Sequence, residues 1–155
     1  MANLDMDVKV TVVNLAPWNV AFPNRARGGD TCFAPSSKVR VRRDELEAQV
    51  SAGNKLLNGI DGAGSHATLY IDDDETRRYF EFDSEDGKTK QNVITDEKIL
   101  KWFELKTMSA FEKNIRENVI TMAEKRYVIN AIKRLKLDSY EKISFCQEYC
   151  KFKLY

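Results

Sequence analysis

The chain has 155 residues, of which 43% are hydrophobic and 32% are charged, and its formal net charge at pH 7 is +1. This composition is typical of a globular protein with one ordinary domain or two very small ones. The near-zero net charge excludes a strong overall field that would attract nucleic acid or membranes.

Charge is divided unevenly along the chain. Residues 1–94 carry 12 Lys and Arg against 15 Asp and Glu, giving −3, whereas residues 95–155 carry 13 against 9, giving +4. This difference predicts two structural units of different character.

Neither end of the sequence predicts export or a membrane anchor. The first seven residues are acidic and lack an apolar stretch, so no secretory signal is expected. No run approaches the ~20 apolar residues of a membrane span. Cys32, Cys146 and Cys150 are an odd number without a secretory context, which favours reduced thiols in a cytoplasm-type compartment.

The first fifty residues have the pattern of a small β-rich unit. Alternating or β-branched segments predict four strands, at residues 8–13, 18–22, 31–34 and 38–42. The loop 23–30 contains a Gly28-Gly29 pair and is the expected tip of a hairpin. Residues 44–52 predict a short amphipathic helix that ends at Gly53.

The next segment predicts more strand structure, followed by a polar connection. Residues 55–60 and 67–71 are expected as strands joined by the turn-forming residues 61–65. The acidic run 72–75 is placed to stabilise the N-terminal end of a short helix, with residues 80–82 as an alternative last strand. Residues 83–91 are wholly polar and predict an exposed linker.

The C-terminal part has helical periodicity. One long helix is expected from Glu97 to about Asn118. Thr121 and Glu124 have the spacing of a capping box, and a second capping pattern places another helix start near Ser139. The short turn between these two helices predicts a packed helical hairpin. A DNA-reading helix-turn-helix is the alternative, although the turn lacks the usual Gly.

Together these patterns predict an α+β protein. Its parts are a β-rich, barrel- or sandwich-like unit with short helices (residues 1–82), a polar linker (83–94) and a three-helix unit (95–155). A three-helix unit of this size is close to the lower limit for independent stability.

Two groups of residues have the chemistry of metal ligands. Cys146 and Cys150 lie one helical turn apart, and Cys32 and His66 complete the soft ligands, but a zinc site would need all four from distant segments. Small buried apolar residues are the preferred interpretation of the cysteines. Four aspartates lie at or after the 61–65 turn: Asp61, Asp72, Asp73 and Asp74. They either serve as turn and helix-cap residues or form a Mg²⁺ or Ca²⁺ site.

No catalytic residue, cofactor site or metal site is predicted. A single histidine leaves little for triad chemistry, and the glycines are not spaced as a dinucleotide or phosphate-binding loop. The remaining candidate is a basic stretch, residues 25–43, with aromatic neighbours. It is either a solvated strand face or a surface for single-stranded nucleic acid or an acidic protein. The predicted partner-binding residues are Trp18, Arg25, Arg27, Arg40, Arg42 and Arg43.

A resemblance adds a biological class to this architecture. The segments 53–57, 59–67 and 70–77 resemble small proteins of tailed bacteriophages of gut bacteria, and the likeness continues through 103–106 and 110–114. No activity is assigned to those proteins, so no site residue is carried over. The resemblance implies a phage protein, with an accessory part of the particle as the expectation.

These observations favour a non-enzymatic binding or structural protein of a tailed phage, attached to capsid or neck proteins and present in the virion or the host cytoplasm. Protein partners are expected, with no cofactor and no membrane contact. One alternative is a nucleic-acid-binding regulator that uses residues 25–43 or the terminal helices. Another is an intracellular inhibitor of a host defence protein.

Overall fold

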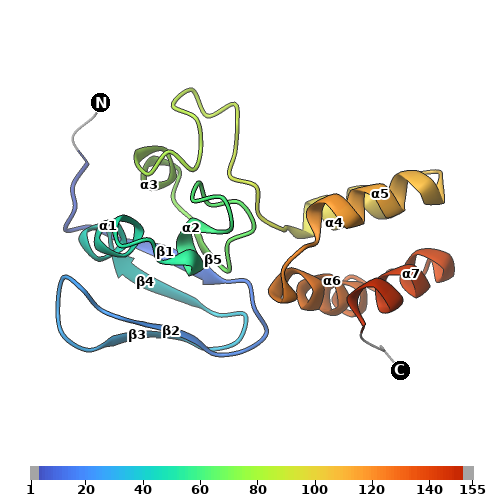
Figure 1. Ribbon diagram of the computed structural model, residues 1–155, viewed down its shortest axis with the longest axis horizontal. Helices are drawn as coiled ribbons and strands as arrows, with labels where there is room; N and C mark the ends of the chain where they lie inside the picture. The colour runs from blue at the N-terminus through green and yellow to red at the C-terminus, as the bar shows by residue number, and fades with distance from the viewer. Residues whose placement is uncertain (1–3, 152–155) are drawn as a thin grey trace. The chain divides into compact units, whose positions relative to one another are not determined.

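The computed structural model describes residues 4–151, and the chain divides into two compact units, Met1–Val93 and Ile94–Tyr155. The first, called the N-terminal unit, holds all the described strands and three short helices, and the second, called the helical unit, holds four helices among its described residues (Figure 1). The fold is therefore α+β, as predicted.

Five strands form two separate antiparallel arrangements in the N-terminal unit. Strand β1 (Lys9–Asn14) lies between β4 (Lys38–Arg42) and β5 (Leu69–Ile71) in a three-stranded sheet. Strands β2 (Val20–Pro23) and β3 (Asp30–Phe33) form a two-stranded ribbon, whose loop is the hairpin tip expected from the sequence.

Strand β1 is central because its alternation matches a half-buried sheet. Val10, Val12 and Asn14 are buried, whereas the residues between them are not. Val12 pairs with Val39 on one side and Ile71 on the other. Buried valines therefore lie at the middle of the sheet and fix its register.

The predicted strand over residues 55–60 is wrong. Helix α1 (Arg43–Ser51) ends at the positive-φ Gly53, and residues Lys55–Asn58 then form the short helix α2. The signal overlooked in the sequence is Asn54, whose side chain accepts a hydrogen bond from the backbone N–H of Leu56 and caps the new helix.

The segment after α2 is a compact loop, in place of the predicted hairpin turn. Asp61 Oδ1 accepts hydrogen bonds from the backbone N–H groups of Ala63 and Ser65, at 2.8 and 3.1 Å. At Gly59 the chain passes so close to Ser65 that an added Cβ would lie 2.0 Å from its carbonyl oxygen. Only glycine fits this crossing.

The polar stretch predicted as an exposed linker is largely exposed between residues 84 and 90, but both of its ends are buried. Asp73 caps the N-terminus of helix α3 (Asp74–Tyr79), as the acidic run suggested. The chain then folds back on the unit. Asp83 and Gln91 are buried, and the N-terminal unit extends to Val93. Buried polar residues require hydrogen-bond partners, and Asp83 has one in the Arg77 guanidinium.

The helical unit contains one helix more than predicted. In place of a single helix over 97–118, there are α4 (Asp96–Phe103) and α5 (Met108–Asn118). The break follows from Thr107, whose hydroxyl accepts from the backbone N–H of Ala110 and starts a new helix. The Lys142 ammonium donates to the carbonyl oxygens of Phe103 and Leu105 and satisfies groups that the break leaves free.

The predicted helical pair is confirmed as α6 (Met122–Arg134) and α7 (Tyr140–Cys150), which pack on each other. The Thr121–Glu124 capping box forms with both of its hydrogen bonds. The second capping pattern does not form. Ser139 is the residue that precedes α7, and its side chain makes no capping hydrogen bond.

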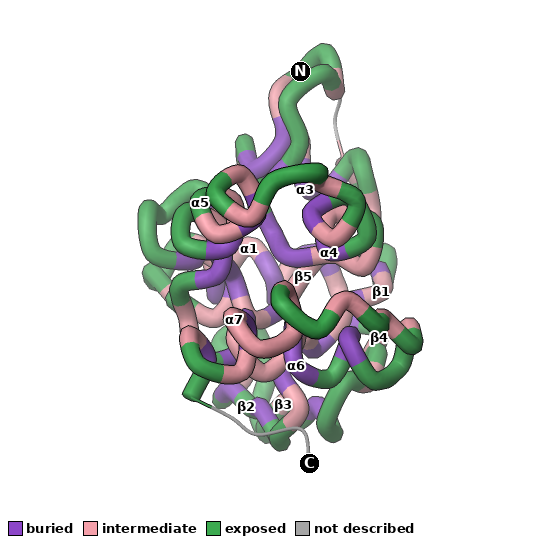
Figure 2. The backbone as a smooth tube through the Cα atoms, turned by 90° about the vertical axis from the view of Figure 1, so that its right-hand side faces the viewer, coloured by how far each residue is buried: buried purple, intermediate pink, exposed green. Residues whose placement is uncertain are grey.

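The core of the helical unit is built from one face of each helix. Ile99, Phe111, Ile115, Val128 and Ile129 are fully or almost fully buried, and exposed positions lie along the outer turns of the helices (Figure 2). The part of the chain covered by the structure has no helix with the length and apolarity that a bilayer crossing requires.

Asp96 links the start of α4 to α6. Its carboxylate accepts hydrogen bonds from Arg134 at 2.5 Å and from the Tyr127 hydroxyl at 2.7 Å. The bond from Arg134 holds the pKa of Asp96 below its usual value despite partial burial. Burial and the bond to Asp96 raise the pKa of Tyr127 to about 12, so its hydroxyl stays protonated and keeps donating.

Gly59→Ala and Gly62→Ala form a matched pair that tests the crossing at Gly59. Both positions have positive φ, which costs an alanine roughly 1–2 kcal/mol, but nothing lies within 4 Å of a Cβ at Gly62. We expect Gly59→Ala to lower the free energy of unfolding by at least about 2 kcal/mol more than Gly62→Ala, as measured by urea unfolding. Equal losses would contradict the close contact.

Candidate functional site

The predicted basic stretch does not form one cationic surface, and Arg43 shows this most clearly. Its guanidinium is buried, donating to Thr76 Oγ1 and Asp73 Oδ2 at 3.0 Å each and to the carbonyl oxygen of Asp5 at 3.1 Å. Arg43 therefore joins α1 to α3, and the prediction that it faces solvent on the strand is wrong. Because β4 ends at Arg42, Arg43 is already helical and its side chain turns inward.

Arg42 and Arg27 converge on one carboxylate. Arg42 donates to Asp44 at 2.8 Å and to Asp7 at 2.6 Å, and Arg27 lies 3.7 Å from Asp44. The hydrogen bond from Arg42 lowers the pKa of Asp44. Two of the predicted contact residues are thus largely neutralised within the unit.

The other three predicted residues are exposed but dispersed. Arg40 donates to the carbonyl oxygen of Lys9 at 2.8 Å. Trp18 is 38% exposed and precedes β2, whereas Arg25 follows the other end of that strand. The structure therefore does not gather the six residues into a single site.

The loop that carries Arg25 is closed from within by Glu45. This buried carboxylate accepts hydrogen bonds from the backbone N–H groups of Arg25 and Ala26 at 2.9 Å each, and the Gln49 side chain donates to it at 2.8 Å. Burial alone would raise the pKa of Glu45, but these bonds outweigh it and hold the pKa below the usual value. Glu45 occupies the position that a bound anion would take in a nest of backbone N–H groups.

Arg77 lies at the centre of a buried cluster of charged side chains in the N-terminal unit. Its guanidinium donates to Asp83 Oδ2 at 3.0 Å and to the carbonyl oxygen of Ile71 at 2.6 Å, pairs with Asp74, and lies 4.9 Å from the centroid of the Tyr70 ring. Burial opposes its charge, but the bond to Asp83 and the nearby carboxylates hold its pKa above the usual value. Every polar neighbour of Arg77 belongs to the fold, so the cluster is structural.

The residues considered as metal ligands have separate roles. Asp73 caps α3 and binds Arg43, Asp74 pairs with Arg77, and Asp61 holds its own loop. Cys32 is exposed on β3, whereas Cys146 and Cys150 are buried in the helical unit. Within residues 4–151 no group of three or more His, Cys, Asp or Glu is arranged to hold a metal ion.

A different surface emerges in the helical unit, where two aromatic rings of α7 stack. The rings of Phe145 and Tyr149 are nearly parallel, with centroids 5.8 Å apart. The Arg116 guanidinium of α5 lies 5.2 Å from the Phe145 centroid and 5.7 Å from the Tyr149 centroid. The Lys125 ammonium of α6 lies 5.2 Å from the Tyr149 centroid. Three helices therefore contribute to one cation–aromatic cluster.

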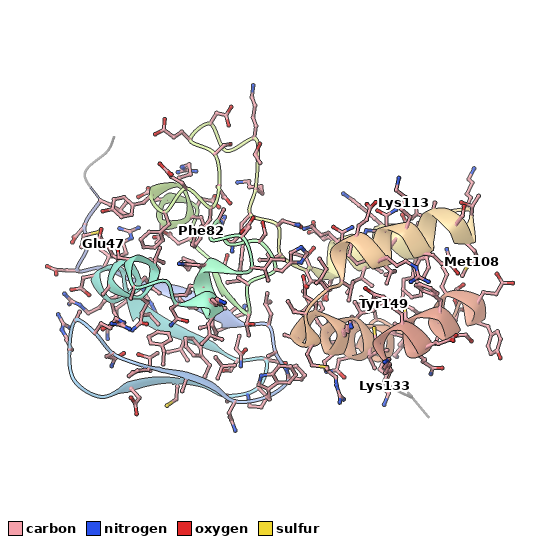
Figure 3. The ribbon with its side chains drawn as sticks, viewed as in Figure 1. Glu47, Phe82, Met108, Lys113, Lys133 and Tyr149 are labelled. Atoms are coloured by element: carbon pink, nitrogen blue, oxygen red, sulfur yellow. The ribbon has the colours of Figure 1, made fainter. Side chains whose placement is uncertain are left out.

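Hydrogen bonding fixes this cluster to the helix junction. The Tyr149 hydroxyl donates to the carbonyl oxygen of Val119 at 2.7 Å, and Val119 ends α5. Tyr149 lies between α5 and the α6–α7 pair (Figure 3). Its ring is consequently held in place before any partner arrives.

Two exposed apolar side chains lie close to the cluster in sequence. Ile120 and Met122 are 45% and 60% exposed, and they lie in the sequence between Arg116 and Lys125. No carboxylate among the described residues lies within 4.0 Å of Arg116 or Lys125. We call this surface the cation–aromatic face; it consists of Arg116, Ile120, Met122, Lys125, Phe145 and Tyr149.

Sequence reasoning missed the cation–aromatic face. The one local signal is the four-residue spacing of Phe145 and Tyr149, which places both rings on the same side of a helix. The approach of Arg116 and Lys125 depends on how the helices pack.

Comparison with protein families, with curated proteins and with solved structures finds no match in any of the three. The candidate site is therefore described from this chain alone.

Arg77→Met tests the buried charge centre, with Arg78→Met as its control. Removing Arg77 leaves Asp83, whose side chain is 0% exposed, without its main countercharge. We expect Arg77→Met to lower the free energy of unfolding by about 3 kcal/mol or more. Arg78 is a half-buried neighbour without a described ion pair, so Arg78→Met should lower the free energy of unfolding by less than about 1 kcal/mol. Urea unfolding measures both; similar losses would contradict the assignment.

The reactivity of the cysteine thiols tests which of them are buried in the folded protein. Burial raises the pKa of Cys146 and raises that of Cys150 to about 11, so neither supplies thiolate near pH 8. We expect one thiol per folded chain, Cys32, to react rapidly with Ellman's reagent, and the other two to react only after unfolding in urea. Rapid reaction of two or three thiols in the folded protein would show that the helical unit opens.

Proposed function

We propose that this protein is a non-enzymatic binding protein that contacts another protein through the cation–aromatic face. The observation that carries the proposal is that Arg116 and Lys125 are held over aromatic rings without a carboxylate partner among residues 4–151, and that two exposed apolar side chains lie close to them in sequence. Arg, Met and aromatic residues are enriched at protein interfaces.

The preorganisation of this face supports a binding role. Stacking and the Tyr149 hydrogen bond already restrict the side chains that a partner would touch. Less side-chain entropy is then lost on association, and more of the contact energy contributes to affinity.

The charged residues in the interior of the N-terminal unit support a scaffold role. Arg43, Glu45, Arg77 and Asp83 all have partners within the fold, on backbone or side chains. A group that performs chemistry must instead reach a substrate. The N-terminal unit is thus well suited to hold a defined shape.

The biological setting that we propose is the particle of a tailed phage, where the protein would attach to capsid or neck proteins. The support for this setting is the resemblance of the segments 53–57, 59–67, 70–77, 103–106 and 110–114 to small proteins of such phages.

A nucleic-acid-binding regulator is the second candidate. The observation that favours it is the solvent side of α6, which presents Lys133 and Arg134, and the adjacent Lys136, with no exposed carboxylate on the helix. One of these cations is partly committed, because Arg134 pairs with Asp96.

Quantitative mass spectrometry of purified particles tests the proposed setting. We expect the chain in a fixed ratio to the major capsid protein through density-gradient purification, because a particle component stays bound. A phage replication enzyme serves as the control that is removed. Finding the chain only in infected-cell lysate, together with that enzyme, would overturn the assignment to the particle.

A further inference from the structure

We infer that the partner of the cation–aromatic face is an acidic peptide segment with at least one large apolar side chain. This inference rests on the proposed binding function and specifies its partner.

The two cations define the spacing of the acidic groups. Arg116 and Lys125 lie 5.7 and 5.2 Å from the same ring centroid, so their charges are at most about 11 Å apart. Two carboxylates within two turns of one helix span the same distance, since a helix rises 1.5 Å per residue. A single acidic segment therefore reaches both cations.

The apolar requirement comes from Ile120 and Met122. Both are large and exposed; Ile120 lies in the short connection between α5 and α6, and Met122 is the first residue of α6. A partner that paired only with the charges would leave this apolar area in water. An apolar anchor would bury it, at roughly 25 cal/mol for each Å² removed from solvent.

A peptide fits this face better than a nucleic acid does. The rings stack on each other and are approached by cations, so less of their surface is left for stacking with bases. A continuous row of phosphates would meet only these two cations, whereas a peptide can place its acids opposite them and an apolar side chain against Ile120 or Met122.

Fluorescence anisotropy with the full-length protein tests the inference. The main probe is a labelled 16-residue helical peptide that carries glutamates and one row of leucines. Two control peptides replace its glutamates with lysines or its leucines with serines. The fourth probe is a labelled 20-nucleotide oligo(dT). We expect the main probe to bind at least tenfold more tightly than the others, because it alone supplies both acids and an apolar anchor.

Variants locate the binding surface. The double variant R116Q/K125Q should weaken binding of the acidic leucine peptide about fivefold and reduce its salt dependence, since two exposed ion pairs are lost. The matched control is K113Q/K133Q, which removes the same charge from the same two helices at positions that point away from Tyr149 (Figure 3). Met122→Ser should also weaken binding, whereas R116K/K125R retains it.

The outcomes separate the inference from the proposed function. Equal effects of the two double variants, or equal binding of the lysine peptide or oligo(dT), would overturn the inference. If the chain is nevertheless a component of purified particles, the proposed function stands with a different partner chemistry. Circular dichroism of each variant shows that a loss of binding does not come from unfolding.

Discussion

The burial of Arg77 beside Asp83 is the constraint on which the N-terminal unit depends. The pair joins α3 to the polar segment that follows it, and Asp83 in turn accepts from the backbone N–H of Gln91 at 2.7 Å. Breaking such a pair leaves an uncompensated charge in the interior. With only short strands and helices, this unit depends on polar side chains to fix its loops, as Glu45 does for the ribbon.

Local patterns in the sequence were sufficient for much of the fold. The alternation of β1 and the Thr121 capping box depend on residues close in sequence, and both predictions are confirmed. The helix starts after Asn54 and Thr107 carry an equally local signal, which the apolar pattern around them masked. The ends of the 83–91 stretch are different, because the burial of Asp83 and Gln91 depends on Arg77 and on distant backbone atoms that composition does not reveal.

The candidate site was less predictable for a physical reason. A run of arginines in sequence does not indicate where their countercharges will lie, and Asp7 and Asp73 reach the basic stretch only after folding. Conversely, Arg116 and Lys125 are unremarkable helix-surface residues until three helices bring them to one ring. Surface chemistry of this kind is a property of tertiary packing.

The carboxylate of Glu45 links the ribbon loop to helix α1 more closely than the position of that loop at the surface suggests. The amide hydrogens of Arg25 and Ala26 are bonded to a side chain of α1, although both residues are exposed. Their exchange with solvent deuterium requires the hydrogen bonds to Glu45 to break first. One carboxylate of a helix thus protects two amide hydrogens of an exposed loop from exchange.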